Sequence, residues 1–138
     1  MQKKSRREFI GNTGKAAVAT GLVTFADTNT TAMSLSDKFI HHVYFWLKNP
    51  DSKEDKQKLV EGLRKLSKVK TIKEFHIGQP ADTNRDVIDR SYAVSWCLLF
   101  DNATDQASYQ VDPVHLKFVE ECSSLWTKVV VYDSVSVS

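Results

Sequence analysis

The sequence lacks a long hydrophobic run, an internal repeat and a low-complexity tract. Its apolar run, AAVATGLVTFA at residues 16–26, has 11 residues, whereas a helix needs about 20 apolar residues to cross a bilayer. The chain has 138 residues, of which 41% are hydrophobic and 10% aromatic. This composition is typical of one ordinary globular domain with a buried core.

The main part of the chain also lacks net charge. Five of the 19 basic residues and two of the 17 acidic residues lie in residues 1–32, so residues 33–138 carry 14 basic and 15 acidic residues, a net charge of −1. A nearly neutral domain has no electrostatic footprint for nucleic acid. We therefore expect no nucleic-acid partner.

Residues 1–32 have the pattern of an export signal and a polar linker. A basic segment precedes the apolar run, and within it Ser5-Arg6-Arg7-Glu8-Phe9-Ile10 resembles the twin-arginine (Tat) signal, which directs folded proteins across the bacterial membrane. The alternative is an uncleaved basic tail with a chance Arg-Arg pair. We predict export to the periplasm and no membrane attachment after processing.

Cleavage of this segment is expected after Ala26 or Ala32, and the pattern does not distinguish the two sites. No cysteine lies near either site, which argues against a lipid anchor. The domain is then residues 33–138.

The remaining residues alternate between strand and helix patterns. Segments 38–48, 69–78, 91–100 and 127–137 are predicted strands, because β-branched and aromatic residues concentrate in them and Gly, Pro or Asn bound them. Residues 52–68 have apolar residues at helical spacing. A second helical stretch follows Asp101 and Asn102, is interrupted at Pro113 and resumes toward Trp126, which we expect to end it as a core anchor. The order is βαββαβ.

Both faces of the predicted sheet are apolar. Side chains alternate across a strand, so His41, Val43, Phe45 and Leu47 share one face of the first strand while His42, Tyr44 and Trp46 share the other. Two helices cover only one face, and a large exposed apolar face is unusual for a soluble monomer. We therefore predict a homodimer in which two sheets pack face to face.

This organisation resembles the stress-responsive dimeric α+β barrel (Dabb) family. The resemblance covers residues 38–136 and rests on the HHVYFWLK strand, the LxxLxxV pattern at 63–69, Gly78, the strand ending in Phe100 and Tyr109-Gln110-Val111-Asp112-Pro113-Val114-His115. It implies an α+β, ferredoxin-like βαββαβ fold, a four-stranded antiparallel sheet with helices on one face, and two subunits that close a barrel.

Members of the family include plant enzymes that cyclise linear polyketides without a cofactor. By resemblance, their pocket residues correspond here to His41, Tyr109 and His115, with His115 as the general base. Two positions depart from the plant pattern. Asp112 stands where those enzymes have another histidine, and the first helix has Gly62 or Leu63 near the position of a pocket tyrosine.

Each of the three residues also has a purely structural interpretation. An imidazole suits proton abstraction near neutral pH, but His115 follows an Asp-Pro helix start, where it could simply pack. Tyr109 could be an aromatic packed at a helix end. His41 could be a core histidine whose polar atoms are satisfied.

No metal or cofactor is expected. His41, His76 and His115 come from separate elements without the short spacing of metal ligands. No sequence motif indicates another cofactor. Cys97 and Cys122 are predicted to lie on different sides of the sheet, so we expect buried thiols and no intrachain disulfide.

The sequence thus predicts a domain that binds a small organic molecule between sheet and helices. It could be a cofactor-independent lyase or cyclase with a histidine base. The alternatives are a non-catalytic ligand-binding or stress protein and an enzyme of the antibiotic-biosynthesis monooxygenase type.

Overall fold

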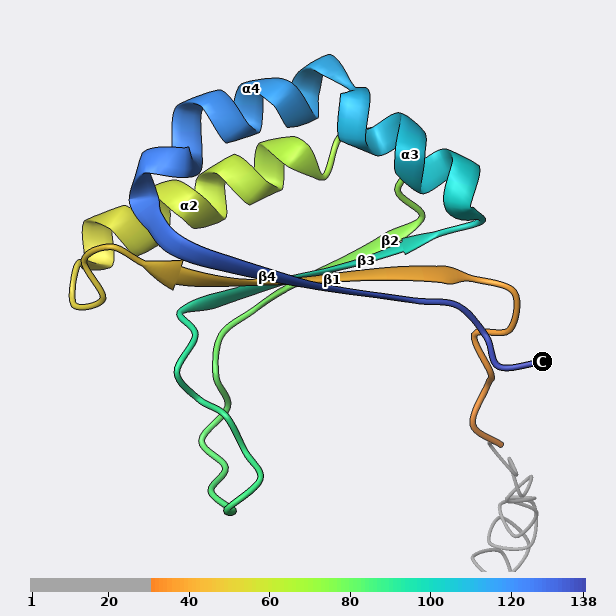
Figure 1. The fold of residues 1–138 in the computed structure, drawn as a ribbon, viewed down its shortest axis with the longest axis horizontal. Helices are drawn as coiled ribbons and strands as arrows, with labels where there is room; N and C mark the ends of the chain where they lie inside the picture. Colours follow the sequence, from red (N-terminus) through yellow and green to blue (C-terminus); the bar gives the residue numbers. More distant parts are fainter. Residues whose placement is uncertain (1–30) are drawn as a thin grey trace, which may run out of the picture. The chain divides into compact units, whose positions relative to one another are not determined.

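Four antiparallel strands form one sheet, and the helices lie over one of its faces (Figure 1). The computed structural model describes residues 31–138. The predicted export signal of residues 1–32 lies almost entirely outside the described residues. Residues 34–138 form one compact unit.

The elements follow the predicted βαββαβ order, with the second helical stretch divided in two. They are β1 (Phe39–Leu47), α2 (Lys53–Leu66), β2 (Glu74–Gly78), β3 (Val94–Phe100), α3 (Ala103–Val111), α4 (Pro113–Cys122), a 3-10 turn (Ser123–Leu125) and β4 (Trp126–Ser134). The strands are arranged β2-β3-β1-β4. The α+β, ferredoxin-like prediction is confirmed.

Local chemistry explains where the helices begin. The Ser52 hydroxyl accepts a hydrogen bond from the backbone N–H of Asp55 (3.1 Å) and caps α2, and an acidic first turn favours the positive end of the helix dipole. Asn102 caps α3 in the same way. Asp112 ends α3 and caps α4, since its carboxylate accepts from the N–H of Val114 (2.8 Å). The chain therefore bends at Asp112, as Pro113 predicts.

The core lies between the helices and the covered face of the sheet. Burial alternates along β1, where Val43, Phe45 and Leu47 are buried. Leu59 and Leu63 of α2 are fully buried against this face. Every second residue of the strand and one face of the helix are therefore apolar, and these two surfaces pack together as one core.

One expectation about an element boundary is wrong. Trp126 does not end a helix but begins β4, because the 3-10 turn of Ser123–Leu125 already ends the helical stretch. The backbone carbonyl of Leu125 accepts from the N–H of Lys48 (2.9 Å), which draws the chain into the sheet. The Trp126 ring still packs on the core, 5.0 Å from the ring of Phe45 between centroids.

The other face of the sheet carries no helix within residues 31–138, and the loop of residues 79–93 projects from that side (Figure 1). Cys97, His42 and His76 are cross-strand neighbours on this open face. Cys122 instead lies between α2 and α4 beside Gly62. The two thiols are free and on opposite sides of the sheet.

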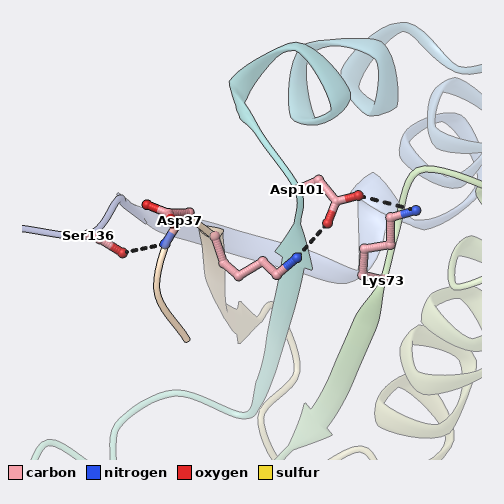
Figure 2. A network of polar contacts seen from close by, with 5 residues as sticks. Asp37, Lys73, Asp101 and Ser136 are labelled. Carbon is pink, nitrogen blue, oxygen red and sulfur yellow. Dashed lines mark hydrogen bonds and ion pairs between the residues drawn. The ribbon is translucent and has the colours of Figure 1, made fainter. Parts of the chain in front are cut away.

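A network of polar contacts joins the strand ends at one edge of the domain (Figure 2). Asp101, directly after β3, accepts from Lys38 (2.6 Å) before β1 and pairs with Lys73 (3.4 Å) before β2. The backbone N–H of Asp37 donates to the Ser136 hydroxyl (3.0 Å) beyond β4. Exposed pairs of this kind contribute little stability.

Candidate functional site

The three residues singled out in the sequence line one cavity between the sheet and the helices. The cavity has a volume of about 130 Å³. Its walls are His41, Val43, Phe45, Trp96, Tyr109, Gln110, His115, Phe118, Val119, Trp126, Val129 and Val131. We call it the helix-side cavity. None of the lining residues is a lysine, an arginine, an aspartate or a glutamate, so the cavity suits an uncharged group.

The break at Asp112 brings Tyr109 and His115 together. Tyr109 lies in the last turn of α3 and His115 in the first turn of α4, and their ring centroids are 4.7 Å apart. The alternation of β1 turns His41 toward the helices, and its ring centroid lies 5.8 Å from that of Tyr109. The tyrosine ring is therefore close to both imidazoles.

Tyr109 is buried, and its hydroxyl accepts a hydrogen bond from the indole N–H of Trp96 (3.2 Å). Burial raises the pKa of Tyr109 to about 12, although the bond from Trp96 works in the opposite direction. The hydroxyl stays protonated at neutral pH. Because Trp96 uses one of its lone pairs, the O–H group remains able to donate to an oxygen atom in the cavity.

His41 is held by a carboxylate that the sequence analysis did not identify. Its Nδ1 lies 2.5 Å from Oδ1 of Asp133 in β4, and the two residues are directly opposite each other in the sheet register. A carboxylate accepts from an imidazole N–H, so this contact places a proton on Nδ1 and fixes the orientation of the ring. Asp133 could have been noticed in the sequence, because it follows Val129 and Val131 at alternate positions and is the charged residue on that apolar face of the last strand.

One ring nitrogen of His115, Nδ1, is buried and has no well-formed hydrogen-bond partner among the described residues. Burial lowers the pKa of His115 below 6.5; the backbone of Gln110 and the charge of Asp112 oppose this shift, and His41 adds to it. The ring is therefore neutral at pH 7 and able to accept a proton.

The third histidine considered as a metal ligand is not part of this cavity. His76 is exposed on the open face, whereas His41 and His115 are on the helix side. Within residues 31–138, no group of three His, Cys, Asp or Glu side chains is arranged to hold a metal ion. In the same part of the chain, no helix is long and apolar enough to span a membrane.

The two departures from the plant pattern have structural explanations. Asp112 is the cap of α4, so it is used at the helix start. At Gly62, a Cβ atom would lie 2.7 Å from Sγ of Cys122 and 3.2 Å from the ring of Phe118. A tyrosine has no room there, and Leu63 is fully buried. The helix-side cavity thus has Tyr109 as its only tyrosine.

The chain matches the stress responsive A/B barrel domain over residues 39–136. No curated protein matches it. A crystal structure of an Arabidopsis thaliana protein is similar with 24% identity and a TM-score of 0.62, over 72% of this chain and 96% of that one.

Two further solved structures share the fold. A hydroxynitrile lyase from Passiflora edulis has 20% identity and a TM-score of 0.61, over 73% of this chain and 94% of that one. A protein from Bacteroides fragilis, described as dimeric with a ferredoxin-like fold, has 16% identity and a TM-score of 0.58, over 73% of this chain and 98% of that one. At these identities, the similarity establishes the fold alone.

Proposed function

The chain belongs to the stress responsive A/B barrel domain family, and from this premise we propose that its helix-side cavity binds a small uncharged organic molecule, with His115 as a general base. One observation carries the proposal. The imidazole of His115, whose pKa is lowered by burial, lines a cavity that also holds Tyr109 and His41. The acceptor nitrogen of a neutral imidazole takes a hydrogen bond from a ligand hydroxyl, which is the first step of proton transfer to it.

The three side chains divide the chemistry between them. In the cleavage of a hydroxynitrile, His115 takes the proton of the hydroxyl group as the carbonyl forms and the bond to the nitrile carbon breaks. The protonated imidazole then gives this proton to the leaving cyanide, which departs as hydrogen cyanide. Tyr109 donates a hydrogen bond to the oxygen on which negative charge develops. His41, oriented by Asp133, accepts from a second polar group of the ligand and fixes its position. These roles need no cofactor.

The size of the cavity limits what reacts there. A cavity of about 150 Å³ is known to hold one benzene molecule, so about 130 Å³ accommodates a group no larger than one ring. A lyase acting on a compact hydroxy compound fits this volume better than a cyclase acting on a long polyketide. The similar structure of a hydroxynitrile lyase suggests a hydroxynitrile as the substrate class to test first, and mandelonitrile, which has one ring, serves as the probe.

The test has two measurements. Cleavage of mandelonitrile is measured by the release of benzaldehyde, and binding of benzaldehyde is measured by NMR. We expect His115→Gln to lower turnover by about 10²–10⁴-fold, the contribution typical of a general base, while binding persists. His76→Gln, on the open face, is the matched control. Cleavage that is unchanged in His115→Gln would refute the role of the base.

The same experiment separates the alternatives. Binding of benzaldehyde without turnover of mandelonitrile would support the non-catalytic ligand-binding protein. Oxygen consumption with an aromatic substrate would instead support the monooxygenase alternative. If the wild-type protein neither binds nor cleaves these compounds, the proposed ligand class is wrong.

We also propose that the chain forms a homodimer through the open face of its sheet. Tyr44, Trp46 and Val130 lie only half-buried on that face, and an apolar surface of this kind favours a partner. The similar Bacteroides fragilis protein is described as dimeric.

Export to the periplasm by the twin-arginine route remains our proposal from Ser5-Arg6-Arg7-Glu8-Phe9-Ile10. A route that carries folded proteins is compatible with a domain that binds its ligand before export.

A further inference from the structure

A row of four side chains crosses all four strands on the open face of the sheet. His76 of β2 lies opposite Cys97 of β3, Cys97 lies opposite His42 of β1, and His42 lies opposite Tyr132 of β4. Two imidazoles therefore flank one thiol on the proposed dimer interface. None of these four residues lines the helix-side cavity.

His42 is already half-buried in the single protomer, in a strand that has a neighbour on each side. Its ring is stacked on that of Tyr44, with centroids 4.4 Å apart, and its Nδ1 lies 3.2 Å from the Tyr44 hydroxyl. When two sheets pack face to face, the inner strands lie farthest from the solvent at the sheet edges. A second copy of the chain on this face therefore covers His42.

The groups that face His42 within residues 31–138 provide no negative charge for an imidazolium. Burial raises the pKa of the Cys97 thiol and that of the Tyr44 hydroxyl, so both stay protonated and uncharged near neutral pH. Tyr132 presents a phenol from β4. Glu74 is the acid among the strand residues of this face, and it lies on the edge strand β2, two residues before His76.

The positive charges near His42 oppose its protonation. Burial lowers the pKa of His42 below 6.5, and repulsion from His76 and His41 lowers it further. Lys128, the other basic strand residue of the open face, lies against the Trp46 ring. The His42 ring is therefore neutral at pH 7, and its protonated form would be an unpaired charge that is costly to remove from water.

We propose that the homodimer is pH-sensitive: it forms with His42 neutral and dissociates when His42 takes up a proton. This inference rests on the proposed dimer through the open face. Protons bind the separated protomers in preference to the dimer, so the dissociation constant is constant above the pKa of His42 in the protomer and rises as the pH falls below it. With one proton taken up by each of two protomers, the rise approaches about 100-fold per pH unit.

The test measures the dimer dissociation constant of the processed protein by sedimentation equilibrium, from about pH 7.5 to about pH 5 at constant ionic strength. Circular dichroism at each pH shows that the protomers stay folded. We expect a dimer at the upper pH and a dissociation constant at least about tenfold larger at the lower pH. An unchanged dissociation constant over this range would overturn the proposal.

Two variants assign the effect to one histidine. His42→Leu should remain a dimer at both ends of the pH range, because an apolar side chain has no charge to bury. His115→Gln, which removes a histidine on the helix side of the sheet, should keep the pH dependence of the wild type. A His42→Leu dimer that still dissociates at the lower pH would contradict the role of His42.

The same measurements separate this inference from the proposed dimer itself. A wild-type protein that is monomeric at the upper pH would refute the dimer, and the pH dependence with it. A dimer whose dissociation constant does not change with pH would refute the pH dependence alone.

Discussion

At the scale of single residues, the candidate site consists of side chains that are unremarkable in the sequence and unusual in their surroundings. His115 is neutral because its ring is withdrawn from water, and Tyr109 keeps its proton because its hydroxyl is buried beside Trp96. Burial disfavours the charged form of both groups. The helix-side cavity thus pairs a base with a hydrogen-bond donor at neutral pH.

The lowered pKa of His115 predicts how stability depends on pH. Below about pH 6.5 the unfolded chain binds a proton at this histidine that the folded chain does not, so the free energy of unfolding falls as the pH falls toward the folded pKa. Above about pH 6.5 both states are neutral at this site and the contribution vanishes. Urea unfolding from about pH 7.5 to about pH 5.5 should therefore show a smaller loss of stability in His115→Gln than in the wild type.

His76→Gln controls for the removal of a histidine in general. If His115→Gln and the wild type lose the same free energy of unfolding over this range, the histidine is not buried in its neutral form. The comparison uses the change with pH, so a constant offset in stability between the variants does not affect it.

At the scale of elements, α2 and α4 are packed closely because Gly62 has no side chain. A Cβ atom there would lie 2.7 Å from Sγ of Cys122, which is closer than carbon and sulfur atoms approach in folded proteins. Alanine is otherwise the better helix residue by about 1 kcal/mol. Close packing between α2 and α4 therefore requires glycine at position 62, although alanine has the higher helix propensity.

We predict that Gly62→Ala lowers the free energy of unfolding by about 1–3 kcal/mol, the usual cost of overpacking. In a Cys122→Ala background the same change should cost less or stabilise the protein, because the closest contact is gone. Urea unfolding of the four proteins in this double-mutant cycle measures the coupling. Additive effects would show that Cys122 is not the obstacle.

The sequence predicts the type and order of the helices and strands better than the residues at which they begin and end. The order of the elements along the chain and the break at Pro113 follow from local patterns, and both are found. The predicted strand at 69–78 begins only at Glu74, because Val69 is buried under the end of α2 as part of the core. Tertiary packing, which a local pattern does not contain, moved that boundary.

At the scale of the whole molecule, we expect the open face of the sheet to determine the oligomeric state. Val130→Lys places a charge on the half-buried edge of this face and should shift the protein from dimer to monomer, measured by size exclusion with light scattering. Glu61→Gln, on the exposed side of α2, changes the net charge equally and should leave the dimer intact. A wild-type monomer would refute the argument from the two apolar faces.

The proposed export is also a property of the whole chain. Replacing both Arg6 and Arg7 by lysine keeps the charge of the N-terminal segment but removes the twin-arginine pattern. We predict that this variant stays in the cytoplasm, as measured by fractionation of a bacterial host with a twin-arginine pathway. Periplasmic recovery of the variant at the wild-type level would show that another route carries the protein.

The sequence by itself determined the order of the elements along the chain and the faces of each strand, because periodicity, caps and breakers act within a few residues. The resemblance to the Dabb family, and not a local pattern, pointed to His41, Tyr109 and His115. Only the tertiary structure decided the partners of those residues. Asp133 is 92 positions from His41 and meets it through the register of β1 with β4. Trp96 meets Tyr109 across the interface of sheet and helix. Such contacts depend on the packing of distant segments, which no local pattern specifies.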